Sequence, residues 1–258
     1  MQNRYAGDIG DYGKLGLLRA LQASGLSIGV NWYLVPDEKH NSDGRYVRYL
    51  NDPHMRRCDE PLWLELKHIV DSEQRSVSAL ENEQVLKARF FSQMLDLSGK
   101  PKTERQMLRD KWYRDALCSL SGLDLVFVDP DNGLLVPSAA GTMRENKYVK
   151  PVEIEKYYFQ GSSVVYYQHK ARKPDSFYIR QHQMLMERIG DTEASGFCVK
   201  FKKTSQRFFF FLAHPSHKAV ISGVLRGMLS GAWIDCFEEK MIGSDWKGGL
   251  PHAATEHF

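Results

Sequence analysis

The sequence of 258 residues carries a formal net charge of +3, with 42% hydrophobic and 26% charged residues. This length and composition are typical of a globular protein that buries a sizeable core without disulfides. With this charge the protein is only mildly basic. An anionic partner such as a nucleic acid is therefore possible but is not required.

The four cysteines lie far apart in the sequence, and none belongs to a Cys-X-X-Cys pair. This spacing argues against a zinc ribbon or a dithiol redox motif, and isolated cysteines are typical of core residues in a reducing compartment. No apolar run approaches the roughly 18 residues that a membrane span needs, and no apolar signal segment follows Met1. We therefore expect a soluble, cytoplasmic protein with no membrane partner.

The first half of the chain is predicted to begin with a loop and a helix. Leucines from Leu15 to Leu21 follow a helical pattern, and Gly25 is a plausible end of that helix. Ile28–Val35 is aromatic and β-branched and ends at Pro36, so it predicts a strand. Residues from about 59 to 112 are mostly polar with a helical period. We interpret them as a helical insertion, or as helices flanking one poorly marked strand.

The second half alternates helices with strands. In chain order the predicted elements are a helix at Thr103–Ser119, a strand at Leu123–Val128, a helix at Pro151–Phe159, a strand at Ser163–Tyr167, a helix at Asp175–Ile189, strands at Gly196–Lys202 and Arg207–Leu212, and a helix at Ser216–Leu229. Alternation predicts a mostly parallel sheet covered on both faces, and the short gap between the last two strands predicts an antiparallel hairpin. We expect a single Rossmann-like α/β domain over residues 1–258.

The clearest candidate site follows the predicted strand that ends at Val128. The residues there are Asp129-Pro130-Asp131-Asn132-Gly133. In open α/β sheets ligands bind just outside the carboxyl ends of strands, where two carboxylates and a carboxamide could converge on a metal, an amine or a ribose. Each of these residues also favours turns, so the alternative is that the segment is simply a tight turn.

A second candidate is the glycine- and aspartate-rich segment before the first helix. It reads Tyr5-Ala6-Gly7-Asp8-Ile9-Gly10-Asp11-Tyr12-Gly13-Lys14. Glycines beside a helix N-terminus can let backbone N–H groups approach an anionic ligand. The spacing matches neither GxGxxG nor a P-loop, and Asp8 or Asp11 could simply cap the helix.

Two further strand ends carry polar side chains. The first has one histidine and three cations: His169, Lys170, Arg172 and Lys173. The histidine could act as a general acid or base and the cations could contact phosphates, or the segment is a solvated strand end. At the second, His214 and His217 lie three residues apart and could form a metal pair, although HExxH spacing is absent.

Together these segments resemble the S-adenosylmethionine-dependent methyltransferase superfamily, and within it the bacterial ribosomal-RNA adenine-N6 methyltransferases of the J type. That family has an N-terminal His-Ala-Gly-Asn…Ala-Asp…Lys element, to which residues 5–14 are similar in order and spacing. Its catalytic loop is Asp-Pro-Pro-Tyr, where this chain has Asp129-Pro130-Asp131-Asn132. The family's late Asn-Pro-Pro element corresponds to residues 213–216. The chain departs from the family by lacking the stacking aromatic and the glycine-rich cofactor loop after the first strand.

The resemblance implies a set of site residues. S-adenosylmethionine would lie at the carboxyl edge of the sheet, with Lys14 near its carboxylate. Asp129 would hold the amine of the substrate. The other cofactor-binding residues implied are Tyr5, Gly7, Asp8, Asp11 and either Asp37 or Glu38 on the ribose hydroxyls, and the other catalytic candidates are Asp131, Asn132 and His169.

The expected function is therefore a methyltransferase-like enzyme that acts on a nucleic-acid base or a similar amine. One alternative is a metal-dependent nuclease or phosphohydrolase, in which Asp129 and Asp131 would bind Mg²⁺ or Mn²⁺. The replacement of Pro-Tyr by Asp-Asn motivates it. A second alternative is a non-catalytic binding module that keeps the fold.

Overall fold

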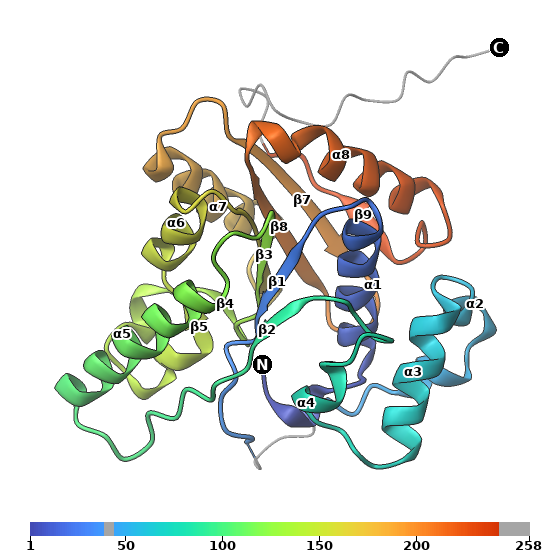
Figure 1. Ribbon diagram of the computed structural model, residues 1–258, viewed down its shortest axis with the longest axis horizontal. Coiled ribbons are helices and arrows are strands. Elements are labelled where there is room, and N and C mark those ends of the chain that lie inside the picture. The colour runs from blue at the N-terminus through green and yellow to red at the C-terminus, as the bar shows by residue number, and fades with distance from the viewer. Residues whose placement is uncertain (39–43, 243–258) are drawn as a thin grey trace.

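A central sheet of seven strands runs through the molecule, which we describe from a computed structural model covering residues 1–38 and 44–242 (Figure 1). The strand order is β2-β1-β3-β6-β8-β7-β9. In that order the strands are Arg89–Phe91, Ile28–Asn31, Leu125–Val128, Ser163–His169, Arg207–Ala213, Ser195–Phe201 and Phe237–Glu239. Strands β2, β1, β3 and β6 are parallel, and β8 runs antiparallel between β6 and β7. The mostly parallel sheet with an antiparallel β7–β8 hairpin is confirmed.

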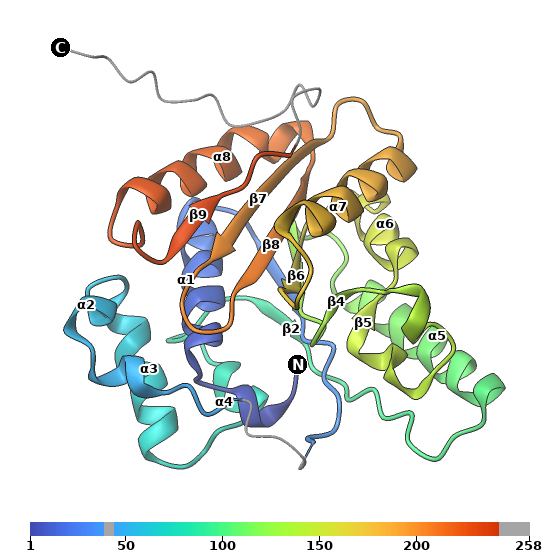
Figure 2. The same ribbon diagram turned by 180° about the vertical axis from the view of Figure 1, so that it is seen from behind.

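Helices cover both faces of this sheet (Figures 1 and 2). The helices are α1 Ile9–Ala23, α2 Pro53–Arg56, α3 Glu60–Asp71, α4 Val77–Leu80, α5 Lys102–Ser119, α6 Pro151–Phe159, α7 Asp175–Ile189 and α8 Pro215–Ser230. Helices α1 and α8 cover one face, with α3 packed against α1, and α5, α6 and α7 cover the other. Side chains of β3 alternate between the two cores, with Leu125 and Phe127 in the first and Val126 and Val128 in the second. No helix in the described part of the chain is long and apolar enough to cross a bilayer.

Residues 59–112 contain helices that flank one strand, which is the second of the two interpretations above. Strand β2 pairs in parallel with β1, with Val30 opposite Phe90. Only three residues of β2 pair, and the first is exposed, the second half-buried and the third buried. The segment therefore lacks the alternation of buried and exposed residues that identifies a strand in a sequence. The pairing with β1 is what makes this segment a strand.

The predicted strand Ile28–Val35 is too long, because β1 ends at Asn31. The side chain of Asn31 accepts the N–H of Tyr33 at 3.1 Å, and Tyr33 has a φ of 45°. Beyond this bend the chain meets the N-terminus, where the N–H of Val35 donates to the carbonyl of Met1 at 3.0 Å. A tertiary contact therefore replaces the last part of the strand. The elements predicted in the second half agree with the structure to within two residues at each end.

A buried histidine makes the stability of the fold sensitive to acid. His182 of α7 is fully buried, its Nδ1 lies 3.1 Å from the hydroxyl of Tyr166, and burial lowers its pKa to about 3. The unfolded chain takes up this proton near the ordinary value of about 6.5. Because the unfolded state then binds more protons, the free energy of unfolding should fall as the pH drops below 6.5, by up to about 1.4 kcal/mol per pH unit.

Urea denaturation of the native protein and of His182→Gln at pH 7.5 and pH 4.5 measures this effect. We expect the native protein to lose more stability than the variant between the two pH values. Equal losses would show that His182 is not the group responsible.

Candidate functional site

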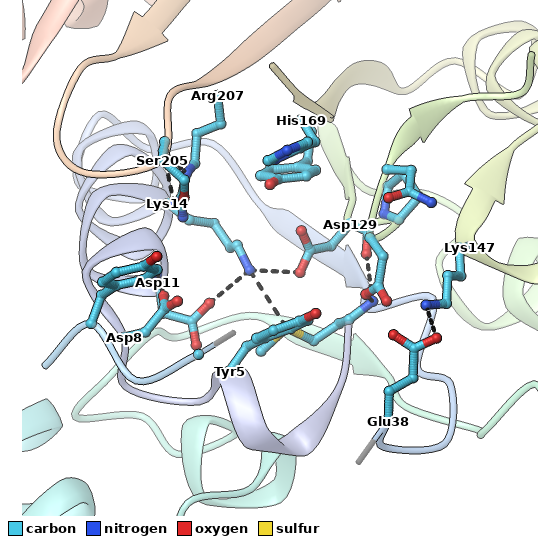
Figure 3. A pocket seen from close by; sticks show the side chains of 17 residues that line it. Tyr5, Asp8, Asp11, Lys14, Glu38, Asp129, Lys147, His169, Ser205 and Arg207 are labelled. Atoms are coloured by element: carbon cyan, nitrogen blue, oxygen red, sulfur yellow. Dashed lines mark hydrogen bonds and ion pairs between the residues drawn. The ribbon is translucent and has the colours of Figure 1, made fainter. Parts of the chain in front are cut away.

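A cavity of about 370 Å³ opens at the carboxyl edge of β3 and β6 (Figure 3). Its walls include the first turns of α1, the loop that follows β3, the end of β6 and the start of β8. Strand β8 reaches the same edge because it runs antiparallel to β6. The volume lies in the range that small-molecule ligands occupy. The cavity therefore lies where the topology of an open α/β sheet places a binding site.

The centre of the site is a buried network around Lys14. Asp8 caps α1 and accepts hydrogen bonds from the N–H groups of Gly10 and Asp11, so the helix begins at the edge of the cavity. Asp11 and Lys14 are three residues apart and share one face of the helix. Lys14 Nζ lies 2.8 Å from Asp11 Oδ1 and 2.6 Å from Asp129 Oδ2, and all three side chains are at most 4% exposed (Figure 3).

Burial and ion pairing act in opposite directions on this network. Burial alone would lower the pKa of Lys14, but the carboxylates of Asp11 and Asp129 outweigh it and hold the pKa above its usual value. For Asp129, burial raises the pKa, and Lys14 lowers it only in part. The cation therefore stays charged, while Asp129 is a carboxylate with an increased affinity for a proton.

The Asp129–Gly133 loop is held by specific partners and is more than a solvent-exposed turn. Asp131 accepts a hydrogen bond from Gln2 Nε2 at 2.6 Å, and its Oδ1 lies 2.7 Å from the α-amino group of Met1. Burial raises the pKa of Asp131, but that amino group and Gln2 outweigh the effect, so the pKa lies below its usual value. Gln168 of β6 donates to the carbonyl of Asn132 at 2.8 Å.

Gly133 is required in this loop both by its backbone and by the space around it. Its φ is +110°, and a Cβ at this position would lie 2.1 Å from Oε1 of Gln168, which also accepts the N–H of Leu134. We expect Gly133→Ala to lower the free energy of unfolding by about 3 kcal/mol, through backbone strain and overpacking together. Gly25 is the matched control, because it has a φ of +97° and nothing within 4 Å of a Cβ.

Gly25→Ala should cost about 1 kcal/mol, from strain alone. Thermal or urea unfolding of both variants measures the difference. If both variants lost the same free energy of unfolding, the contact with Gln168 would add nothing to the cost of a Cβ at position 133, and Gln168 would not be fixed against the loop.

Most of the sequence-predicted site residues meet at the cavity. Asp129, Asp131, Asn132, His169, Tyr5, Asp8, Asp11 and Lys14 all line it. Gly7 lies behind the wall, where its N–H donates to Asp11 Oδ2 at 3.1 Å and so orients that carboxylate. Asp37 lies beside the cavity and accepts the N–H of Arg4 at 3.3 Å. Its neighbour Glu38 lines the cavity and forms an ion pair with Lys147.

Sequence reasoning missed Tyr46, Ser205 and Arg207, which also line the cavity. Arg207 begins the apolar strand β8, and its guanidinium bonds the carbonyl of Ser205 at 3.0 Å. It lies across the first turn of α1, where a Cβ on Gly10 would be 1.3 Å from its Nη1. A cation at the start of an apolar strand is the one signal that could have identified it. Tyr46 carries no such signal.

The two histidines after β8 make internal contacts. His214 stacks on Tyr158 with ring centroids 3.9 Å apart, and His217 Nδ1 lies 2.9 Å from Ser163 Oγ. His217 Nε2 is 3.5 Å from Asp124, but Ser163 is only 1% exposed, so this serine cannot reach a substrate as a nucleophile. Over residues 1–38 and 44–242, no group of three or more His, Cys, Asp or Glu side chains is arranged to hold a metal ion.

The cations predicted to contact phosphate lie in the β6–α7 loop, directly after His169. Lys170 Nζ donates to the carbonyl of Lys173 at 3.1 Å and lies 3.7 Å from Asp175. Arg172 and Lys173 are exposed. The structure thus places a basic loop next to a residue that lines the cavity.

No family model matches the chain, and no curated protein matches it significantly. The function is therefore inferred from the chemistry of the cavity.

Proposed function

We propose that this protein is an S-adenosylmethionine-dependent methyltransferase that acts on an amino group of a nucleic-acid base or a similar amine. The observation that carries the proposal is the position of Asp129, which follows a strand of the parallel sheet and borders a cavity beside Lys14 of α1. This is the pair of residues that the resemblance assigns to the amine and the cofactor.

The charges and rings of the cavity suit the cofactor. S-adenosylmethionine presents a carboxylate, an ammonium, a sulfonium, ribose hydroxyls and an adenine ring. Arg207 offers a cation for the carboxylate, whereas Asp8 and Glu38 offer acceptors for the ammonium and the hydroxyls. Tyrosine rings can contact the sulfonium and stack on adenine. The bound cofactor would supply the electrophilic methyl group.

Residues of the chain would position the amine for this transfer. Lys14 holds the Asp129 carboxylate through Oδ2. A substrate amino group can donate a hydrogen bond to Oδ1, and the raised pKa of Asp129 lets it accept the proton that the amine loses. Holding the amine in line with the methyl group would contribute most of the rate, because transfer from a sulfonium needs little acid–base help.

Base recognition is supported by residues outside the Asp129 loop. The loop lacks the aromatic that stacks on a flipped base in the resembling family, but Tyr46 is 47% exposed and lines the cavity, with Tyr5 and Tyr167 also in its walls. The exposed cations Arg172 and Lys173 lie in the loop after His169 and can contact flanking phosphates.

The metal-dependent alternative has less support. Asp129 and Asp131 each already contact a cation, Lys14 and the α-amino group of Met1 respectively. A divalent ion bound by both carboxylates would lie close to both of these cations, and like charges at that distance repel.

Titration calorimetry with S-adenosylmethionine tests the proposal directly. We expect binding in the micromolar range, and at a ligand concentration of 100 Kd a stabilisation of about 2.7 kcal/mol. Asp129→Asn keeps a hydrogen-bonding group beside Lys14, so it should bind the cofactor with similar affinity but transfer the methyl group to RNA or DNA at least about 100-fold more slowly.

Absence of binding at millimolar cofactor would reject the proposal. Mg²⁺-dependent cleavage of nucleic acid that is lost in Asp129→Asn would favour the metal-dependent alternative. A protein that shows neither binding nor cleavage would be a non-catalytic module.

A further inference from the structure

Two cysteines that are far apart in the sequence lie in neighbouring segments away from the cavity. Cys58 lies between α2 and α3, and Cys236 lies between α8 and β9. The Sγ of Cys58 is 3.1 Å from the carbonyl oxygen of Ala232, and the Sγ of Cys236 is 3.8 Å from the Sδ of Met55. Each thiol thus contacts the segment that carries the other, and Figures 1 and 2 both show α2 beside the end of α8.

The two thiols differ in exposure and in acidity. Cys58 is partly exposed, whereas Cys236 behind it is buried. Hydrogen bonding with Cys58 lowers the pKa of the Cys236 thiol, and Lys203 and Lys202 lower it further against burial and Asp235. The same hydrogen bond, together with burial, raises the pKa of Cys58. A thiolate next to a second, accessible thiol is the arrangement of a redox-sensitive pair.

The other two cysteines differ from this pair. Cys198 is buried in β7, and burial raises the pKa of its thiol well above the usual value. Cys118 is exposed near the end of α5. They provide an inert and an accessible reference within the same chain.

We propose that Cys58 and Cys236 are an oxidative modification site that closes to a reversible disulfide. With hydrogen peroxide as the oxidant, one thiol becomes a sulfenic acid and one water is released. The second thiol then displaces the hydroxyl of the sulfenic acid, so that the S–S bond forms and a second water leaves. The two sulfurs together lose two electrons and two protons, and the peroxide accepts them.

The bond would tie together two segments that both hold α1. The hydroxyl of Tyr12 in α1 donates to the carbonyl of Met55 at 2.5 Å, and its ring packs on Trp233 at 4.9 Å. A disulfide between Cys58 and Cys236 closes a long loop, so it should restrict the unfolded chain strongly. Oxidation should therefore raise the melting temperature, by about 5 °C or more.

The test uses the full chain treated with hydrogen peroxide and then alkylated. Non-reducing peptide mapping should recover the Cys58 peptide joined to the Cys236 peptide, with a mass about 2 Da below the sum of the two. Dithiothreitol should separate them and reverse the rise in melting temperature. Cys58→Ser and Cys236→Ser should each abolish the cross-link and the rise, whereas Cys118→Ser should leave both unchanged.

Peptide mapping of the native chain needs no variant, so it remains decisive even if Cys236→Ser does not fold. Sulfinic acid at Cys58 without a cross-link would overturn the proposal. So would a cross-link that involves Cys118. The site does not depend on the proposed methyltransferase function, since neither thiol lines the cavity.

Discussion

Replacing Lys14 by methionine is expected to destabilise the protein by about 3–5 kcal/mol and to abolish the proposed methyl transfer. The substitution keeps the apolar stem but leaves Asp11 and Asp129 buried without their cation, at sites where the ion pairs now measure 2.8 Å and 2.6 Å. An uncompensated buried charge is among the costliest single changes in a protein. The loss of transfer follows because Asp129 would no longer be held at the cavity.

The cost of Lys14→Met should depend on pH. Burial already raises the pKa of Asp129 and Lys14 lowers it, so removing Lys14 raises the pKa further. A carboxyl group whose pKa is higher in the folded than in the unfolded state favours folding at low pH, and this contribution is lost as the pH rises through the folded value. We therefore expect the deficit to be largest at neutral pH and to shrink in acid.

Urea denaturation at pH 7.5 and pH 5 measures both effects. Lys67→Met is the matched control, because Lys67 forms an exposed ion pair with Asp71 at 2.8 Å and should cost less than about 1 kcal/mol. Equal costs for the two lysines would contradict the buried network. In the double variant Lys14→Met/Asp129→Asn, part of the lost stability should return, because one of the two unpaired charges is removed.

Replacing Arg109 by methionine should lower the free energy of unfolding by a similar amount. In this case the loss comes from the scaffold of the fold and leaves the cavity unchanged. Arg109 and Glu153 are both buried and form a two-pronged pair, with Nε–Oε1 and Nη2–Oε2 distances of 2.8 Å. Arg109 also donates to the carbonyls of Glu145 and Tyr148 at 2.9 and 2.7 Å. It thereby ties α5 to the start of α6, and we expect a loss of about 3–5 kcal/mol.

Calorimetric melting of Arg109→Met and of Arg109→Met/Glu153→Gln tests this interpretation. The double variant no longer buries a lone carboxylate, so it should be the more stable of the two. Cofactor affinity measured well below the melting temperature should be unchanged, because neither residue lines the cavity. If Arg109→Met weakened cofactor binding as strongly as a cavity variant, the pair would belong to the site and not to the scaffold.

Elements with strong local signals were predicted well. The first turn of α6 contains Pro151 and Glu153, two residue types that favour a helix start. Helix α7 is followed by Gly190, which caps it in the left-handed conformation. Strand β3 is a continuous apolar run because both of its faces are covered. By contrast, β9 and β2 are three residues long and exist because a neighbouring strand supplies hydrogen bonds.

In the candidate site, too, some residues could be located from local sequence signals, whereas others depend on long-range contacts. Asp129 could be located from sequence because a polar loop after a buried parallel strand reaches the ligand-binding edge of the sheet, whichever helices surround it. The sequence also indicated Asp8 or Asp11 as the cap of the first helix, and Asp8 is the cap in the structure. These conclusions depend on residues close together in the chain.

Only the tertiary structure shows that Lys14 is held between Asp11 and Asp129, that Arg207 lies over Gly10, and that Cys58 and Cys236 each contact the segment that carries the other. Apart from the local Lys14–Asp11 pair, each of these contacts joins segments that are far apart in the sequence. The antiparallel return of β8, for example, brings Arg207 to the edge of the sheet where α1 begins. The sequence by itself therefore determined the α/β class and the edge of the sheet at which the site lies. Long-range packing decided which charges are buried together there, because burial and pairing depend on neighbours that no local pattern specifies.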